Sequence, residues 1–185
     1  ERLVLDSGSS DGSQRCAASL RARVLEHRQP GRFLISEQRN WALEQAGLQS
    51  AWVLFLDADD QFRFAVAASR AMQAAGRVPP LLLAGVGYGA SYTKPANKRL
   101  RDYTPTPMAT EAGSGAADPF VAFLTDTLWP ELARRYPVRE DVRGLAGHSL
   151  GSLLVLHALF QRRPFFNRLL ASAPSLWWDN RALLC

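Results

Sequence analysis

Short apolar runs alternate with longer stretches of helical periodicity along the whole chain. The runs of strand length are 3–5, 24–25, 51–56, 81–86, 142–146 and 168–173. The stretches between them that favour helices are 14–23, 36–46, 62–75, 118–136 and 149–161. Strands that alternate with helices predict an α/β fold, a three-layer sandwich with a mostly parallel and continuous sheet in the middle.

The segment 90–117 departs from this alternation. It carries proline, threonine, glycine and lysine and shows no clear periodicity. Loops of this length are usually functional or disordered. We therefore predict a long surface loop here.

Composition and charge exclude several classes of function. The chain has 185 residues, of which 47% are hydrophobic and 21% charged, so it is long enough for a globular domain with its own core. The net charge is +5, but the basic residues form no stripe interleaved with aromatic residues, so we expect no nucleic-acid partner. No apolar run approaches the roughly 20 residues of a membrane-spanning helix.

Cys16 and Cys185 are too few for a disulfide framework and lack the spacing of metal ligands. We therefore expect a reducing, cytoplasmic location. The chain begins at Glu1 and ends within a predicted helix, from which we expect the natural protein to extend at both ends. The sequence gives no indication of the oligomeric state.

The strongest chemical signal is the pentapeptide Gly147-His148-Ser149-Leu150-Gly151, which lies between a predicted strand and a predicted helix. In a nucleophile elbow, the serine occupies a sharp and strained turn, and the two glycines let the strand and the helix approach each other. The amide of Leu150 and the helix N-terminus then offer positive potential to an oxyanion. The pattern predicts that Ser149 is a nucleophile.

Four further segments carry a family resemblance: "RDYTPT" at 101–106, "RYPV" at 135–138, "LAGHSLGSLLVLHALF" at 145–160 and "ASAPSLWWDN" at 171–180. Together they resemble the esterase family of α/β hydrolases, and in particular the enterobactin-type siderophore esterases. The resemblance extends over about 60–185. It implies a serine hydrolase that needs no cofactor and cleaves a small-molecule ester with Ser149.

The same resemblance implies further site residues. The turn at Gly87 and Tyr88 would provide a second oxyanion donor, from Gly87, and would border the substrate. The residues that would also border the substrate are Arg101, Tyr103, Trp177 and Trp178. Arginine and tryptophan suit an anionic, aromatic substrate, although packing in the core is an equally good explanation of the two tryptophans.

A serine nucleophile needs a base, and the three histidines of the chain do not fit that role. His148 lies within the elbow, His157 about two turns along the following helix, and His27 far upstream. Because α/β hydrolases place the histidine after the nucleophile and the acid, we expect the base beyond residue 185. Asp179 is a conceivable acid. The chain as given is therefore expected to be weakly active or inactive.

The N-terminal third carries a second resemblance. The segments "LVLDSGSSDGSQRCAASLRARVLEH" at 3–27, "QRNWALEQA" at 38–46 and "WVLFLDADD" at 52–60 resemble the nucleotide-binding start of family 2 glycosyltransferases. This resemblance implies that Asp6 and Arg39 contact a nucleotide and that Asp57 and Asp59 hold Mg²⁺ or Mn²⁺. Strand-end aspartates can also simply cap a helix.

Three hypotheses follow from these patterns. The first is a serine esterase of the siderophore-esterase type, with an α/β-hydrolase core at 61–185. The second is a metal-dependent sugar-nucleotide-binding glycosyltransferase fragment that uses the segment 1–60. The third is an inactive chimera in which the two segments are joined near Asp60.

Overall fold

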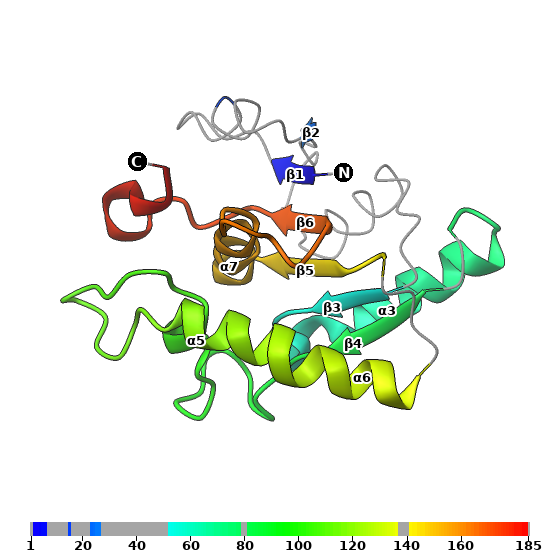
Figure 1. The fold of residues 1–185 in the computed structure, drawn as a ribbon, viewed down its shortest axis with the longest axis horizontal. Helices are drawn as coiled ribbons and strands as arrows, with labels where there is room; N and C mark the ends of the chain where they lie inside the picture. The colour runs from blue at the N-terminus through cyan, green and yellow to red at the C-terminus, as the bar shows by residue number, and fades with distance from the viewer. Residues whose placement is uncertain are drawn as a thin grey trace.

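The computed structural model describes residues 2–6, 15, 23–26, 52–78, 81–136 and 141–184. Six strands lie within these ranges: β1 (Arg2–Asp6), β2 (Arg23–Glu26), β3 (Trp52–Phe55), β4 (Leu82–Gly85), β5 (Gly144–His148) and β6 (Arg168–Ser172). They form one sheet in the order β2-β1-β6-β5-β3-β4, and all five neighbouring pairs are parallel. The predicted α/β fold with a parallel sheet is confirmed (Figure 1).

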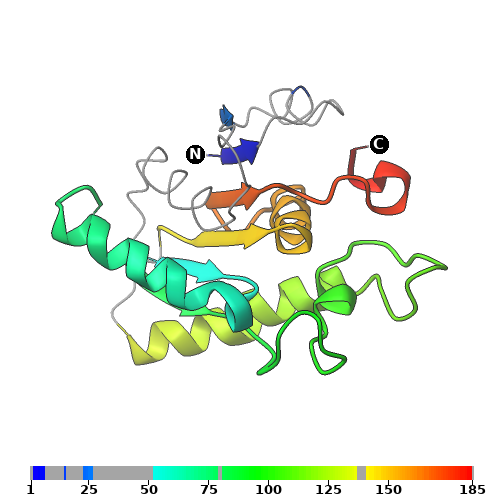
Figure 2. The same ribbon diagram turned by 180° about the vertical axis from the view of Figure 1, so that it is seen from behind.

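Helices cover both faces of this sheet. The helical elements are α3 (Ala58–Ala74), α4 (Arg99–Asp102), α5 (Ala117–Ala122), the π-helix η1 (Phe123–Leu128), α6 (Trp129–Arg135), α7 (Leu150–Leu159) and the 3₁₀ segment η2 (Trp178–Leu184). The continuous run of α5, η1 and α6 lies with α7 on one face, whereas α3 lies on the other (Figure 1, Figure 2). The arrangement is therefore a three-layer sandwich.

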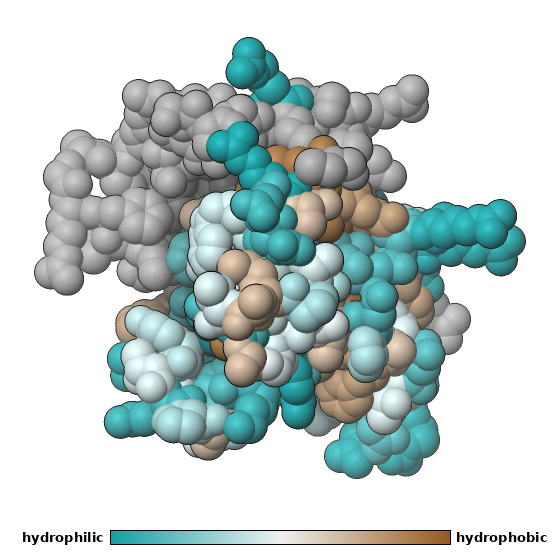
Figure 3. Space-filling view, turned by 90° about the vertical axis from the view of Figure 1, so that its left-hand side faces the viewer, coloured by the Kyte–Doolittle hydropathy of each residue, from teal (hydrophilic) through white to brown (hydrophobic). Residues whose placement is uncertain are grey.

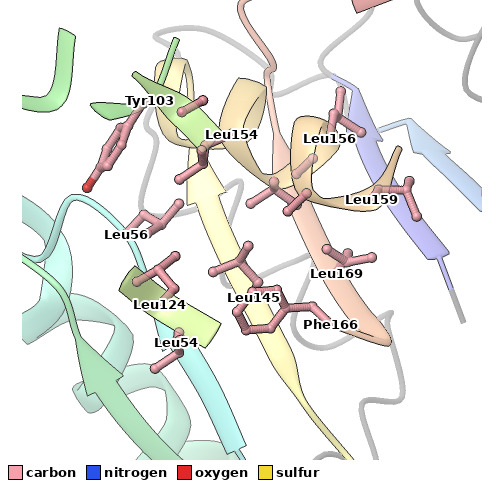
Figure 4. Close-up of a cluster of buried hydrophobic side chains, with 14 of the residues drawn as sticks. Leu54, Leu56, Tyr103, Leu124, Leu145, Leu154, Leu156, Leu159, Phe166 and Leu169 are labelled. Carbon is pink, nitrogen blue, oxygen red and sulfur yellow. The ribbon is translucent and has the colours of Figure 1, made fainter. Parts of the chain in front are cut away.

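The alternation of side chains along β3 shows how the layers are held together. Leu54 of β3 and Leu56, just after the strand, are fully buried. They belong to a core cluster that also contains Leu124 of η1 and Leu154 of α7 (Figure 4). Val53 and Phe55 point to the opposite face, towards α3. Burying a leucine side chain stabilises the fold by about 1.5–3 kcal/mol, so this cluster fixes the helices that carry and flank the elbow.

Helix α7 is the central helix of this core. Eight of its ten residues are buried, from Gly151 to Leu159 with His157 as the exception. A helix that is apolar on nearly all sides is found in the interior of a protein. The sequence "SLLVLHALF" therefore places α7 directly against β5 and β6, with its N-terminus at the carboxyl edge of the sheet.

The segment 90–117 is anchored more firmly than a surface loop. It contains α4, and the side chains of Tyr103 and Thr104 are completely buried. Tyr103 packs against Phe120 with ring centroids 5.5 Å apart. The Thr104 hydroxyl donates to Leu100 O and accepts from the Gly115 amide, both at 2.7 Å. The prediction of a surface loop is wrong for 99–104, because an aromatic side chain there fills the space beside α5.

The N-terminal strands join the same sheet as the rest of the chain, because β1 pairs with both β2 and β6. The helix predicted at 36–46 lies outside the described residues, as does the helix predicted at 14–23 except for Arg15. Within the part of the chain that the structure describes, no helix combines the length and the apolar character needed to cross a membrane.

Candidate active site

Ser149 lies at the tight turn between β5 and α7, with φ 55° and ψ −117°. A side chain at Gly147 would meet the carbonyl group of Gly151 at 2.5 Å, and one at Gly151 would meet the Asp57 carboxylate at 2.8 Å. A non-glycine residue in this conformation is strained and needs strong support from its surroundings. The predicted strand, sharp turn and helix are thus present, and both glycines are required by close approach.

The loop after β6 provides much of this support. The Ser149 amide donates to Ser172 O at 3.0 Å, and the Ser175 amide donates to Ser149 O at 3.3 Å. The Ser149 Oγ lies 3.1 Å from the Ser175 Oγ. Below the turn, the hydroxyl of the buried Ser152 lies 2.7 Å from Gly147 O and 2.6 Å from Ser172 O. The elbow is therefore fixed to β6 by backbone and side-chain contacts.

On the other side of β5 lies β3, which is followed by the buried Asp57. Its carboxylate forms an ion pair with Arg99, with Oδ1 2.8 Å from Nε and Oδ2 3.1 Å from a terminal guanidinium nitrogen. Its amide donates to the Tyr103 hydroxyl at 3.3 Å. Burial raises the Asp57 pKa to about 6, because the loss of hydration outweighs the attraction of Arg99.

Arg99 is a site residue that the sequence did not reveal. It is mostly buried, and beside its ion pair with Asp57 it reaches His148 O at 3.5 Å. The predicted Arg101 is instead more than half exposed and pairs with the adjacent Asp102, with Nε 2.7 Å from Oδ1. Both arginines stand in one short helix, and only the tertiary structure distinguishes the one that faces the elbow.

The Gly87–Tyr88 turn is held by Asp59. The Asp59 carboxylate accepts hydrogen bonds from the amides of Tyr88 and Gly89 at 2.7 Å and of Ala90 at 3.1 Å. A side chain at Gly87 would meet this carboxylate at 2.8 Å. The turn follows β4, which is separated from β5 by β3. The role of Gly87 as an oxyanion donor stays a prediction, and the sheet order favours a donor that follows β3.

Two of the predicted substrate contacts, Tyr88 and Arg101, border an open cavity of about 490 Å³, whose lining residues do not include Ser149. Its walls include Gly87, Tyr88, Arg101, Phe120 and Phe123. Tyr103, in contrast, is fully buried.

The two tryptophans have different environments. Trp178 is 2% exposed, and its indole nitrogen donates to Thr106 O at 3.1 Å, so it is part of the core. Trp177 is 64% exposed and lies two residues after Ser175. Trp177 is therefore the one whose ring a ligand can reach. Figure 3 shows the face at the carboxyl ends of the strands, where apolar and polar residues are interleaved.

Within the described residues, Ser175 is the side-chain hydrogen-bond partner of Ser149. The His157 Nε2 lies 2.6 Å from the Asp118 Oδ1, and the His148 Nδ1 lies 3.4 Å from the Ser172 Oγ. Asp179, the conceivable acid, lies in η2 with φ 44°. His27 lies outside the described part of the chain.

The carboxylates predicted to hold a metal do not fit that role. Asp57 is paired with Arg99, and Asp59 is bonded by three backbone amides, so their oxygens are already engaged. The part of the chain that the structure describes contains no group of three or more potential metal ligands. Asp6 ends β1 with a side chain outside the described set, and Arg39 also lies outside it.

Comparisons with known sequences point in one direction. The profile of the family described as Putative esterase matches residues 39–182. The siderophore triacetylfusarinine C esterase of Aspergillus fumigatus is 37% identical over 107 residues, which are 56% of this chain and 36% of that protein. The ferri-bacillibactin esterase BesA of Bacillus subtilis is 30% identical over 148 residues, 71% of this chain and 50% of that protein. This chain spans half or less of the length of these two relatives.

Solved structures agree with the sequences. The siderophore hydrolase EstA from Aspergillus nidulans superposes with a TM-score of 0.62 at 29% identity, over 76% of this chain and 51% of that one. The BES protein from Bacillus cereus superposes with a TM-score of 0.64 at 25% identity, over 74% of this chain and 53% of that one. The enterobactin hydrolase IroE in complex with DFP superposes with a TM-score of 0.58 at 25% identity, over 73% of this chain and 55% of that one.

Proposed function

The chain belongs to this esterase family, and from that premise we propose that it is a carboxylic ester hydrolase of the siderophore-esterase type with Ser149 as its nucleophile. The observation that carries the proposal is the strained turn of Ser149 between β5 and α7, closed by two glycines that admit no side chain. A strained conformation at one serine in a family of esterases is what a nucleophile elbow requires.

In the proposed reaction, the Ser149 Oγ attacks the carbonyl carbon of an ester. A bond forms between Oγ and that carbon, the Ser149 proton passes to a base, and the carbonyl oxygen becomes an oxyanion. When the tetrahedral intermediate collapses, the carbon–oxygen bond of the ester breaks and the alcohol leaves with a proton. Water then hydrolyses the acyl-enzyme by the same steps in reverse order.

We propose two groups of amides as donors to the oxyanion. The first is the amide of Leu150 at the start of α7, which follows the nucleophile directly. The second is the first turn of α3, which follows β3, the neighbour of β5. The first amides of a helix have no acceptor within it. Because the Ala58 amide donates to Val86 O at 3.1 Å, we propose the Asp59 amide as the second donor.

The relatives are named for siderophore esters, and we propose the same class of small-molecule substrate here. The supporting features are the exposed ring of Trp177 and the cavity bordered by Tyr88, Arg101 and Phe123. An exposed indole can stack on an aromatic acyl group, and a guanidinium can bind its oxygens.

The test is covalent labelling of Ser149 by a fluorophosphonate in a version of the chain that extends past residue 185 to include the expected base, followed by mass spectrometry of the modified peptide. We expect one adduct per chain, on the peptide that contains Ser149, and none in Ser149→Ala. Ser91→Ala is the matched control, because the Ser91 hydroxyl has contact with the Thr93 hydroxyl and not with Ser149, and it should label like the parent chain. If Ser149 stays unmodified in this extended and folded chain, the proposal is falsified.

A second experiment addresses the substrate. Hydrolysis of a tris-catecholate trilactone and of an aliphatic acetate ester should be compared at equal concentration, with Ser149→Ala as the blank. We expect faster release from the trilactone. Equal or faster cleavage of the acetate would contradict a siderophore ester as the preferred substrate while leaving the esterase chemistry in place.

A further inference from the structure

Ser175 is a buried residue whose hydroxyl has contact with the Ser149 Oγ, the atom proposed to react. Its side chain is 4% exposed, and its Oγ lies 3.1 Å from the Ser149 Oγ. In the part of the chain that the structure describes, Ser149 is the hydrogen-bond partner of this hydroxyl. Because buried hydroxyls in native proteins nearly always have a partner, the positions of the two side chains depend on each other.

The backbone around Ser175 is fixed from both sides. Its amide donates to Ser149 O at 3.3 Å, and its carbonyl accepts from the Trp178 amide at 3.1 Å. Trp178 is in turn buried and bonded to Thr106 O. Upstream, Ala173 has φ 47°, a conformation that non-glycine residues rarely adopt. The loop is therefore bent and anchored in a way that delivers one hydroxyl to the elbow.

The sheet order determines from which side this hydroxyl approaches. β5 lies between β3 and β6. The proposed oxyanion donor of α3 follows β3, whereas Ser175 follows β6, so the two groups come from opposite neighbours of β5. The contact of Ser175 with Ser149 is therefore separate from the proposed oxyanion donors.

A serine hydroxyl can both donate and accept a hydrogen bond. In the resting protein, Ser175 can accept the hydrogen bond of the Ser149 hydroxyl and so hold its rotamer. When the Ser149 proton leaves to the base, the Ser149 Oγ can only accept, and the Ser175 hydroxyl can turn to donate to it. We propose that Ser175 is a positioning residue of the esterase, which orients the nucleophile and stabilises it as its proton departs. This inference rests on the proposed function of Ser149.

The alternative is that Ser175 only maintains the loop, as Ser152 maintains the elbow through contacts with two backbone carbonyls. The two roles differ in what a substitution changes. A residue that maintains the loop affects stability and the affinity for the probe. A residue that orients the nucleophile affects the rate of bond formation with little change in affinity.

The experiment measures the maximal rate of fluorophosphonate labelling and the concentration for half-maximal rate for four chains, each extended past residue 185 to include the expected base. These are the parent chain, Ser175→Ala, Ser175→Thr and Ser69→Ala. Ser175→Thr keeps a hydroxyl. Ser69→Ala removes a buried serine hydroxyl from α3, far along the chain from the elbow, and serves as the matched control. Circular dichroism and thermal unfolding establish that each chain is folded.

We expect Ser175→Ala to lower the maximal rate about tenfold, the effect of losing one hydrogen bond to the nucleophile, with an unchanged half-maximal concentration. Ser175→Thr should recover most of the rate, and Ser69→Ala should label like the parent chain.

A folded Ser175→Ala that labels at the parent rate overturns the inference. So does a variant whose half-maximal concentration and melting temperature change while its maximal rate does not. If Ser175→Ala does not fold, Ser175→Cys takes its place, since a thiol is a weak donor of similar size, and it should also label more slowly. An extended parent chain that does not label contradicts the proposed function itself, which is a different result from equal labelling of parent and variant.

Discussion

Of the six described non-glycine residues with positive φ, three stand side by side at the edge of the sheet. Asp57 (φ 58°) follows β3, Ser149 (φ 55°) follows β5 and Ala173 (φ 47°) follows β6, and these three strands are neighbours. Each such residue costs on the order of 1–3 kcal/mol. Strain that collects at one place on a fold indicates a site whose geometry matters more than its stability, and it does so without reference to any motif.

The glycines of the elbow can be tested at this scale. We expect Gly147→Ala to destabilise the chain by about 2 kcal/mol more than Gly113→Ala, because overpacking against a rigid backbone costs more than the positive φ that strains an alanine at position 113. The added methyl group of Gly147→Ala would lie 2.5 Å from the Gly151 backbone, whereas Gly113 (φ 81°) faces open space. Urea unfolding at neutral pH measures both variants. Equal losses would contradict the close approach of β5 and α7.

Single residues also show what a sequence can reveal. Ser149 could be predicted because its motif is local: five consecutive residues specify the turn. Arg99 and Ser175 could not, because each acts across a long separation in the chain, 42 residues between Arg99 and Asp57 and 26 between Ser175 and Ser149. An arginine in a polar stretch and a serine after a strand have no local pattern that distinguishes them from solvent-exposed neighbours.

At the scale of elements, the ion pair of Asp57 and Arg99 connects the end of β3 to α4 and so ties the segment 90–117 to the elbow. The charged groups around Asp57 are Arg99, Asp59 and Asp60, and burial is the largest influence on its pKa. The Asp57 pKa is about 6 in the folded chain, against an ordinary value of 3.8. The folded chain therefore binds more protons than the unfolded chain between about pH 4 and pH 6, and the contribution of Asp57 to stability decreases as the pH rises through this window.

Removing the guanidinium of Arg99 should make the stability of the chain depend more strongly on pH. In Arg99→Met, Asp57 is left buried without its cation, so its pKa rises further and its ionisation at pH 8 opposes folding. We expect a loss of about 3–5 kcal/mol at pH 8, the usual effect of breaking a buried ion pair, and a clearly smaller loss at pH 5. Denaturant unfolding at the two pH values measures both.

Arg101→Met is the matched control for this change. Arg101 pairs with Asp102 from an exposed position in the same helix, and exposed pairs contribute about 0–1 kcal/mol. It should therefore lose little stability at either pH. If Arg99→Met loses the same amount at pH 5 and pH 8, Asp57 does not titrate in the way its burial indicates.

Helices and strands were predicted well where the apolar periodicity is strong. They were predicted less well where contacts with distant parts of the chain determine the local structure. The strands around Leu54, Leu83 and Leu145 and the helix of the elbow follow from apolar runs alone. The helix predicted at 118–136 is present, but its middle is a π-helix, 123–128. A π-turn shifts the register of a helix without changing its composition, so the apolar pattern on either side could not indicate it.

On the scale of the whole molecule, the two resemblances in the sequence lead to different pictures of the chain. A join near Asp60 would separate β1 to β3 from the rest. In the sheet, however, β3 lies between β4 and β5, and β1 lies against β6. The family match also begins at residue 39 and runs through Asp60. The glycosyltransferase resemblance depends on short local motifs. Such motifs do not indicate which strands become neighbours in the sheet.

The position of β1 inside the sheet gives the last prediction. Val4 pairs with Val24 of β2 on one side and with Ala171 of β6 on the other. A proline has no amide hydrogen and is confined to edge strands. We expect Val4→Pro to destabilise the chain by about 1–3 kcal/mol more than Val4→Ala, which keeps the amide, because proline removes the amide hydrogen from a strand that is paired on both sides. Thermal unfolding gives the difference, and fluorophosphonate labelling reports whether β6 still supports Ser149. Since β6 carries the loop of Ser175, the less stable variant should also label more slowly as it is warmed. If Val4→Pro and Val4→Ala unfold together, β1 is not an interior strand, and the sheet that supports the elbow ends at β6.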